Sequence, residues 1–405
     1  MYTQTDYKNI QVLYPETFDL KQFLLLRPTE TFSDETIEFL NGLSAEINKD
    51  PKLRSFPDVA TFAFFCRKAN LLNLKEKNKK EKLVRLGRGV VFHIAPSNVP
   101  VNFAYSLICG LLSGNSNIVK VPSKDFEQVE IICEALQRVN ANKKYKAISD
   151  RVVLIRYDKQ STATHLFSSI CDIRIIWGGD ETIGQIRKNP IPARSFDVTF
   201  ADRYSICVIQ ADSYIKEKAP EKIATDFYND TYLFDQNACT APHLIIWLGK
   251  EKNIEKSKEI FWNKLYELVK SKYLVQPVIA VDKLTSFYSQ AAELDDVKKD
   301  SMTDNSLWRV NLEKLPANID QFRCTSGYFS EYNAKSLLDL IPIVNRKYQT
   351  LAYYGIEKDK LTSFIKQSRL FGIDRVVPIG KTTDFSLVWD GYELITTLSR
   401  NCEIL

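Results

Sequence analysis

The fold is decided by residues 90–125, which read VVFHIAPSNVPVNFAYSLICGLLSGNSNIVKVPSKD. An apolar strand opens the stretch, and a helix with a proline in its first turn is predicted over 99–114. A second strand is predicted over 117–122, and Ser123 is predicted to cap a further helix over 123–139. Strands alternating with helices predict a parallel sheet covered by helices, the doubly wound α/β class.

The alternation continues through most of the chain, after a mainly helical segment over 34–72. Further strands are predicted at 152–157, 173–177, 204–210, 243–249, 307–312 and 374–379, with a long amphipathic helix over 255–273. A chain of this length suggests two or three lobes. We place the first lobe at 1–205, the second at 206–370, and a C-terminal segment at 371–405.

The composition excludes several classes of protein. The 405 residues carry a net charge of +5 with both signs interleaved, which gives no indication of nucleic-acid binding. No apolar run is long enough to span a membrane, and the N-terminus does not resemble a signal peptide. Eight scattered cysteines and three histidines predict free thiols in a reducing cytoplasm, with neither a disulfide framework nor a metal site.

Polar residues stand at the ends of the first strands. Asn98 precedes the helix over 99–114, where its amide could donate to an oxyanion or simply cap that helix. Lys120 lies in an apolar strand, so its ammonium either binds a ribose or phosphate or extends to solvent. Ser123 and Lys124 follow at a predicted helix start, where the helix dipole favours an anion.

Two later motifs could take part in chemistry. Gly178 and Gly179 form a turn between a strand and a helix, a weak signal for a phosphate-binding loop. In DQNACTAP, residues 235–242, Cys239 stands among small residues that leave room for a substrate carbonyl. The alternative is a buried structural cysteine.

The order of these motifs resembles that of the aldehyde dehydrogenase superfamily, where P-x-N, K-x-x-E, a glycine-rich turn and G-Q-x-C-T follow one another. Residues 84–250 carry this order. Residues 90–125 and DRVVPIGKTTDFSLVWDGYELI, residues 374–395, resemble one branch more closely, the NADPH-dependent acyl-CoA reductases of the bioluminescence fatty-acid-reductase type. The resemblance implies a Rossmann-type cofactor domain, a second α/β catalytic domain, and an oligomerisation arm at about 75–90.

The resemblance also implies roles for individual residues. Cys239 would be the acyl-accepting nucleophile, and Asn98 would hold the oxyanion together with the Cys239 amide. Lys120 would bind the adenosine ribose. Three further residues would lie near the pyrophosphate or nicotinamide: Gly178, Gly179 and Asp180.

Two departures from the superfamily pattern indicate the direction of the reaction. NAD-preferring members often carry Glu three residues after the lysine, whereas this chain has Ser123 followed by Lys124, which would accept a 2′-phosphate and favours NADPH. Aldehyde-oxidising members use a Glu to activate water. The corresponding stretch FADRYSICVI has none, and Asp202 is the nearby carboxylate. The acyl-enzyme is therefore expected to be reduced rather than hydrolysed.

We therefore expect reduction of an acyl-CoA or acyl-protein thioester to an aldehyde by NADPH. His243 could assist proton transfer or simply open a strand. Two alternatives stay open: an NAD(P)-dependent aldehyde dehydrogenase that forms acids, and a non-catalytic acyl-carrying subunit of a reductase complex. The resemblance also implies a homo-oligomer and, as a partner, an acyl-protein synthetase.

Overall fold

The computed structural model describes residues 10–79, 83–97, 99–158, 161–295, 297–301 and 304–404. The chain divides into two compact units, Met1–Ala201 with Tyr392–Leu405, and Asp202–Gly391. The border between the units falls near the end of the first predicted lobe. The C-terminal segment does not form a body of its own, because its residues are shared between the two units.

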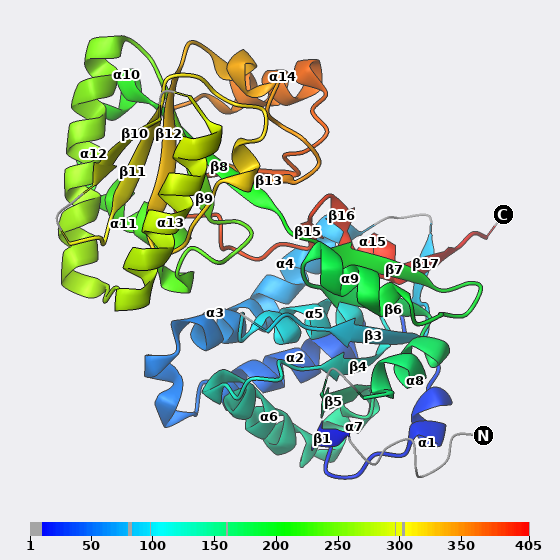
Figure 1. The fold of residues 1–405 in the computed structure, drawn as a ribbon. Coiled ribbons are helices and arrows are strands. Elements are labelled where there is room, and N and C mark those ends of the chain that lie inside the picture. The colour runs from blue at the N-terminus through cyan, green and yellow to red at the C-terminus, as the bar shows by residue number, and fades with distance from the viewer. Residues whose placement is uncertain are drawn as a thin grey trace. The chain divides into compact units, whose positions relative to one another are not determined.

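The first unit is built on a six-stranded sheet with the order β1-β5-β4-β3-β6-β7 (Figure 1). Its strands are β1 (Gln11–Tyr14), β3 (Val90–Ile94), β4 (Ser116–Lys120), β5 (Val152–Arg156), β6 (Ile173–Trp177) and β7 (Phe196–Phe200). Strand β1 is antiparallel to β5, and the other neighbours are parallel. The chain adds strands on one side of β3 and then crosses to its other side, which makes a topological switch point at β3.

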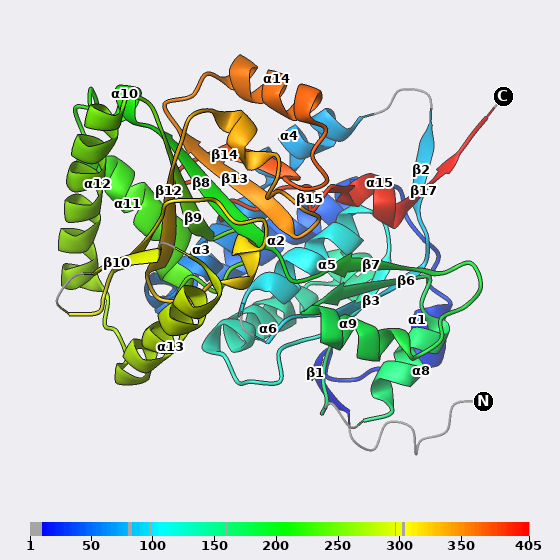
Figure 2. The ribbon, with the colours of Figure 1, turned by 45° about the horizontal axis from the view of Figure 1, so that its top comes forward.

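Helices cover both faces of this sheet (Figure 2). The helices of the unit are α1 (Leu20–Leu24), α2 (Asp34–Ile47), α3 (Pro57–Phe65), α4 (Lys68–Asn78), α5 (Asn102–Leu112), α6 (Glu127–Asn140), α7 (Lys146–Ser149), α8 (Ala163–Ile170), α9 (Asp180–Arg187) and α15 (Leu394–Leu398). Short 3₁₀ helices span Pro51–Ser55 and Lys143–Tyr145. Phe92 and Ile94 of β3 share one core with Phe167 of α8 and Ile183 of α9.

Three helix boundaries differ from those predicted. The helical segment over 34–72 is divided between α2, α3 and α4, because Pro51 and Pro57 cannot continue a helix. Helix α5 begins two residues after Pro100. Helix α6 begins only at Glu127, so Ser123 is not its N-cap and lies in the preceding loop.

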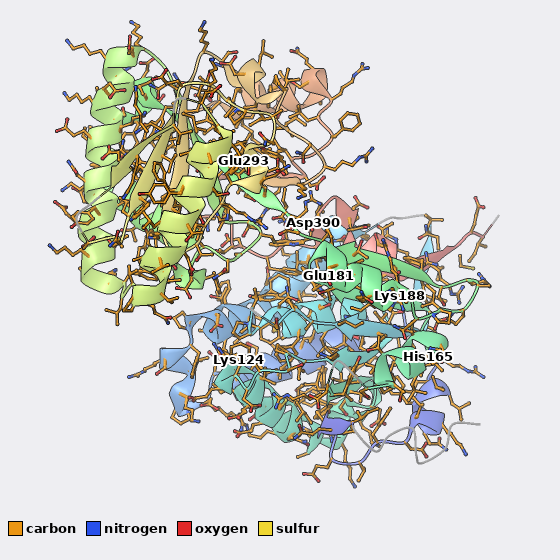
Figure 3. The ribbon with its side chains drawn as sticks, viewed as in Figure 1. Lys124, His165, Glu181, Lys188, Glu293 and Asp390 are labelled. Atoms are coloured by element: carbon orange, nitrogen blue, oxygen red, sulfur yellow. The ribbon has the colours of Figure 1, made fainter. Side chains whose placement is uncertain are left out.

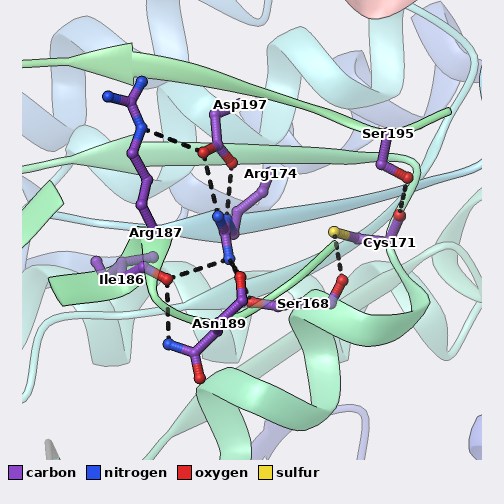
Figure 4. A network of polar contacts seen from close by, with 8 residues as sticks. All are labelled: Ser168, Cys171, Arg174, Ile186, Arg187, Asn189, Ser195 and Asp197. Carbon is purple, nitrogen blue, oxygen red and sulfur yellow. Dashed lines mark hydrogen bonds and ion pairs between the residues drawn. The ribbon is translucent and has the colours of Figure 1, made fainter. Parts of the chain in front are cut away.

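A buried arginine joins β6 to its neighbours (Figure 4). Arg174 is 1% exposed, and its Nε and Nη2 donate to the two oxygens of Asp197 on β7 at 2.8 and 3.1 Å. Its Nη1 donates to the carbonyl of Ile186 in α9 at 3.3 Å and to that of Asn189 at 2.8 Å. A buried charge is stable only with such a full set of partners, so this network fixes α9 against β6 and β7.

A two-stranded antiparallel ribbon completes the first unit. Strand β2 (Val84–Gly87) pairs with β17 (Ser399–Cys402), although the two are far apart in sequence. The buried Asn115 amide donates to the carbonyl of Leu398 at 2.9 Å, which holds the start of β17 beside α5.

The second unit contains a seven-stranded sheet with the order β10-β11-β12-β9-β8-β13-β14. Its strands are β8 (Tyr204–Gln210), β9 (Pro242–Leu248), β10 (Val297–Ser301), β11 (Trp308–Leu312), β12 (Tyr328–Ala334), β13 (Tyr348–Tyr354) and β14 (Arg375–Pro378). The short β15 (Val388–Trp389) also belongs to this unit, and the short β16 (Tyr392–Glu393) belongs to the first. Only β10, among these described strands of the sheet, pairs antiparallel. The doubly wound parallel sheet predicted from the sequence is thus confirmed in both units.

Helices pack on both faces of this sheet as well. They are α10 (Ala211–Tyr214), α11 (Pro220–Thr231), α12 (Glu251–Lys272), α13 (Pro277–Glu293) and α14 (Lys358–Ser368), with 3₁₀ helices at Tyr232–Phe234, Ile319–Gln321 and Leu337–Leu340. Alternate residues of β8 face opposite cores, so Ile206 packs on the side of α14 and Cys207 on the side of α11 and α12. In the described part of the chain, no helix combines the length and apolar character that a membrane span requires.

Candidate functional site

The predicted cofactor residues of the first unit lie at the carboxyl ends of its parallel strands. Lys120 is the last residue of β4, and its ammonium nitrogen lies 3.4 Å from Ser123 Oγ and 5.1 Å from the ring centroid of Tyr157. The structure therefore brings Lys120 and Ser123 together. Open α/β sheets bind ligands at this edge, beside the switch point.

Two further cations lie in or beside the loop from β4 to α6. The exposed Lys124 lies 5.2 Å from the ring centroid of Phe126 through its ammonium nitrogen, as Figure 3 locates it. Arg156, the last residue of β5, pairs with Asp125 of this loop, and its buried Nε has no hydrogen-bond partner among the described residues. The sequence analysis did not identify Arg156. Helix α6 separates this residue from the loop in the sequence, and no local pattern indicates that the two are close in space.

The glycine turn follows β6 as predicted. The Gly178 amide donates to the carbonyl of Phe200 at 3.1 Å, and a Cβ at Gly179 would meet no atom within 4 Å. The turn therefore leaves open space into which a ligand could come close to the backbone. Asp180 and Glu181 occupy the first turn of α9, where they satisfy the helix dipole and oppose a second negative charge.

Asn98 lies outside the described residues, so its predicted role in holding an oxyanion stays a prediction. The segment before it is described. The amide of Ala95 donates to the carbonyl of Lys120 at 3.1 Å, which extends the pairing of β3 and β4 by one residue toward the same edge.

Cys239 lies in the second unit, in the loop that leads into β9. Asp235 and Gln236 open this loop in the left-handed region, with φ of 51° and 60°. The buried Gln236 amide donates to the carbonyls of Pro242 and Tyr328, each at 3.0 Å, and accepts from the amides of Gly327 at 2.9 Å and Tyr328 at 3.1 Å. Four hydrogen bonds thus hold the loop against the start of β12.

The backbone of Cys239 is fixed by a second buried side chain. Ser205 Oγ, at the start of β8, donates to the carbonyl of Cys239 at 2.7 Å and accepts from the amide of Thr350 on β13 at 3.2 Å. Of the three cysteines in this unit, Cys207 and Cys324 are buried and Cys239 is half-buried. Cys239 therefore combines a rigid backbone with partial exposure of the residue, although its thiol is desolvated.

The surroundings of the Cys239 thiol disfavour its ionisation. Desolvation, with a smaller effect from the charge of Asp390, raises the pKa of Cys239 to about 12. A hydrogen bond from Gln349 and the positive charge of Arg203 act in the opposite direction. Arg375 of β14 also faces the thiol. These side chains converge because β9, β8, β13 and β14 are neighbours whose amino ends share one edge.

Sequence reasoning did not find Gln349, Asp390 or Arg375. They lie far from Cys239 along the chain, and only the strand order brings them to it. The available signal was the second resembling stretch, residues 374–395, which contains Arg375 and Asp390.

Asp202 does not serve as a free base in this structure. Both of its oxygens accept hydrogen bonds from Arg323 Nη2, at 2.6 and 2.7 Å, in a partly exposed ion pair.

His243 is the second residue of β9 and packs against Tyr204, with ring centroids 5.7 Å apart and an angle of 20° between the rings. Burial lowers the pKa of His243 to about 3, so the ring is neutral at physiological pH. The ring is in hydrogen-bond contact with the backbone of Cys324. The arrangement supports the reading in which His243 packs at the start of a strand. The described residues contain no cluster of side chains with the composition of a metal site.

Comparison with known proteins agrees with the resemblance seen in the sequence. The family model described as acyl-CoA reductase (LuxC) matches residues 27–401. A long-chain acyl-protein thioester reductase of Aliivibrio fischeri is 24% identical over 313 residues, and one of Vibrio harveyi is 23% identical over 304 residues. Each alignment covers 74% of this chain, and the chain spans only 60% of the length of each relative.

Solved structures show the same fold. An aldehyde dehydrogenase from Bartonella henselae matches with a TM-score of 0.67 and 13% identity, over 95% of this chain and 88% of that one. A lactaldehyde dehydrogenase matches with a TM-score of 0.65 and 11% identity, over 91% and 86% of the two chains. The architecture is therefore aldehyde-dehydrogenase-like.

Proposed function

Because the chain belongs to the acyl-CoA reductase (LuxC) family, we propose that it reduces an acyl thioester to an aldehyde through an acyl group held on Cys239. The observation that carries the proposal is the placement of Cys239. Two buried side chains fix its loop and its carbonyl at the amino end of β9, and Cys239 as a residue is only partly buried, unlike Cys207 and Cys324 of the same unit. A cysteine retained only for packing requires no such support.

The first chemical step is transfer of the acyl group. The Cys239 sulfur attacks the thioester carbon, the donor thiol leaves, and the proton of Cys239 passes to that leaving sulfur. The backbone amide of Cys239 and the side chain of Asn98 are the proposed oxyanion donors. The donor is an acyl-CoA or an acyl-protein. The relatives are named long-chain acyl-protein thioester reductases, which favours a long-chain acyl-protein.

The second step is reduction of the enzyme-bound thioester. NADPH, when bound, supplies the hydride. One further proton from solvent completes the release of the aldehyde and restores the Cys239 thiol. Asp202, the nearby carboxylate, is paired with Arg323, which supports reduction over the acid-forming alternative.

The proposed cofactor site is the carboxyl edge of the first unit. Lys120 and Ser123 would bind the adenosine ribose and its 2′-phosphate, assisted by Lys124 and Arg156. The space at Gly179 would accept the nicotinamide rather than the pyrophosphate, because Asp180 and Glu181 in the first turn of α9 oppose a further negative charge. Ser123 stands where a Glu would bind the ribose hydroxyls, and Asp125, the carboxylate of this loop, is paired with Arg156, which is why NADPH is preferred to NADH in this proposal.

The test replaces the nucleophile. In a Cys239→Ser variant, acyl-thioester reduction and covalent acyl labelling should both disappear while NADPH binding, followed by nicotinamide fluorescence, is retained. Cys402→Ser, which changes an exposed cysteine of β17, is the matched control and should keep full activity. Reduction by Cys239→Ser at near wild-type rate would contradict the proposal.

A substrate panel separates the remaining alternatives. The chain is mixed with acyl-CoA or acyl-protein and either NADPH or NADH, and nicotinamide absorbance is followed. Acid production from an aldehyde with NADP⁺ would support the dehydrogenase alternative. Acylation without any nicotinamide binding would support the acyl-carrying subunit, and would leave a synthetase or reductase partner to be found.

A further inference from the structure

Helix α13 buries polar side chains and exposes apolar ones. Its two buried residues, Lys283 and Gln290, are both 0% exposed, whereas Val281 and Tyr288 on the opposite face are more than half exposed. Helices at the surface of a globular protein normally show the reverse arrangement. Apolar packing therefore does not explain why these two polar residues face inward.

Both buried residues attach α13 to the segment that opens β12. Gln290 Oε1 accepts a hydrogen bond from the hydroxyl of Tyr328 at 2.7 Å. Lys283 Nζ donates to the carbonyl of Ser326 at 2.6 Å and to that of Asn305 at 2.8 Å. The ammonium group thus joins the turn before β12 to the loop before β11.

Lys283 is the less expected of the two. Both of its acceptors are uncharged, and it forms no ion pair with a carboxylate in the described part of the chain. A buried charge without a counter-ion is costly, so a methionine would be more stable at this position if only space had to be filled. The two carbonyls that it holds therefore explain the lysine.

The two carbonyls belong to backbone that needs such support. Asn305 and Ser326 are both in the left-handed region, with φ of 61° and 57°. Residues other than glycine keep this conformation only where their surroundings hold it. Lys283 contacts both residues, so it stabilises the shape of the turn at 326–327 directly.

Ser326 connects the ammonium group to the loop that carries Cys239. The amide of Ser326 donates to the carbonyl of Asp235 at 2.9 Å, and the amides of the next two residues donate to Gln236 Oε1. Gln236 in turn donates to the carbonyl of Pro242. The turn at 326–327 therefore holds the loop on both sides of Cys239.

We propose that Lys283 is a positioning residue for Cys239: its ammonium group holds the turn at 326–327, and that turn holds the loop from Asp235 to Pro242. The effect on acyl transfer rests on the proposed function. The effect on the loop does not, because these hydrogen bonds require neither an acyl donor nor a cofactor. Two separate measurements therefore test the two statements.

The first measurement is backbone hydrogen exchange of peptides covering 235–242 and 326–328, followed by mass spectrometry. Lys283→Met keeps most of the side-chain length and removes the donors, so exchange in both peptides should become about tenfold faster. Lys258→Met is the matched control. Lys258 is also a buried lysine of this unit, but its described partners are Glu331 and Asn311, outside both peptides. It should leave both peptides at the wild-type rate.

The second measurement is steady-state reduction of hexadecanoyl-CoA by NADPH. A loop that no longer holds Cys239 in one position misplaces the nucleophile without changing the groups that bind the donor. Lys283→Met should therefore lower kcat roughly tenfold to a hundredfold with little change in KM. Lys258→Met should keep both constants near their wild-type values, which separates positioning from a general loss of stability.

The proposal is overturned if Lys283→Met leaves exchange in the two peptides unchanged, if Lys258→Met accelerates it equally, or if Lys283→Met keeps the wild-type kcat. If Lys283→Met does not fold, Lys283→Gln, which keeps a neutral donor on a shorter side chain, is judged by the same exchange criterion. Faster exchange in Lys283→Met, together with a wild type that reduces no acyl thioester, would reject the proposed function and retain the inference about the loop.

Discussion

Ser123 is the residue on which the proposed preference for NADPH depends. Its hydroxyl lies 3.4 Å from the Lys120 ammonium, at the edge where a dinucleotide is expected. The sequence predicted a helix cap there, but α6 starts four residues later and the hydroxyl is on a loop. Propensity alone could not show this, because serine is equally suited to both settings.

Ser123→Glu is expected to weaken NADPH binding. A carboxylate beside Lys120 would repel a 2′-phosphate and could bind ribose hydroxyls instead. Loss of a charge-assisted contact predicts a decrease in NADPH affinity of roughly tenfold to a hundredfold, with NADH affected less. Fluorescence titration with both nucleotides measures the change. Ser271→Glu, on the exposed end of α12, is the control, and equal losses for NADPH and NADH would argue against the assignment.

At the scale of elements, the loop before β9 depends on one buried amide. Gln236 supplies all four of its polar contacts to the backbone of this loop and of the start of β12. The small residues beside Cys239 indicated from the sequence that this loop could be functional. The function of Gln236 could not be read there, because its partners at 327 and 328 come much later in the chain.

Gln236→Ala should destabilise the second unit. Four buried backbone groups would lose their partner, which predicts a loss of roughly 3 kcal/mol or more in the free energy of unfolding. Urea denaturation followed by tryptophan fluorescence measures it. Asn237→Ala changes the exposed neighbour and should cost little. A Gln236→Ala variant as stable as Asn237→Ala would show that the loop does not depend on this amide.

Helix α11 is joined to the segment after β14 by a carboxylate with an unusual pKa. Asp230 accepts from the amides of Gly380 at 2.6 Å and Thr382 at 3.0 Å, and burial raises its pKa to about 6. A raised pKa means that the folded state binds the proton more tightly than the unfolded chain. The contribution of Asp230 to the free energy of unfolding is therefore complete below about pH 4, the pKa of this carboxyl in the unfolded chain. It is lost as the pH rises through 6.

The free energy of unfolding of the wild type, relative to Asp230→Asn, should therefore fall between about pH 4 and pH 6. The expected change is roughly 3 kcal/mol at most. Chemical denaturation of both proteins across this range measures it, and effects common to both chains cancel. A difference that is flat with pH would mean that Asp230 does not titrate in this window.

For the molecule as a whole, most of the architecture was predictable. The runs at 173–177 and 204–210 are too apolar and too short for anything but buried strands, and both form the predicted elements. The pairing of β2 with β17 was not predictable from pattern, because no periodicity connects two short strands that lie far apart in the sequence. The surroundings of Cys239 were not predictable for the same reason.

The family resemblance implies an oligomerisation arm at about 75–90, and β2 lies in that range. We therefore expect β2 and β17 to contact another copy of the chain. A chain ending at Leu398 lacks β17 and should sediment at a lower mass than the full chain. Val388→Lys, an exposed change outside the ribbon, is the control. An unchanged mass for the shortened chain would exclude the ribbon as the contact between copies.

The packing of Trp177 also gives the first unit an optical reporter of its own. Of the five tryptophans in the sequence, it is the one that belongs to this unit. Its indole stacks on Phe200 with centroids 3.7 Å apart and donates to Ser106 Oγ at 3.1 Å, directly before the Gly178 turn. In a chain whose other four tryptophans are replaced by phenylalanine, the fluorescence would come from Trp177 alone. A reduced nicotinamide that binds nearby would accept energy from this ring, so cofactor binding could be followed on the millisecond scale without a label.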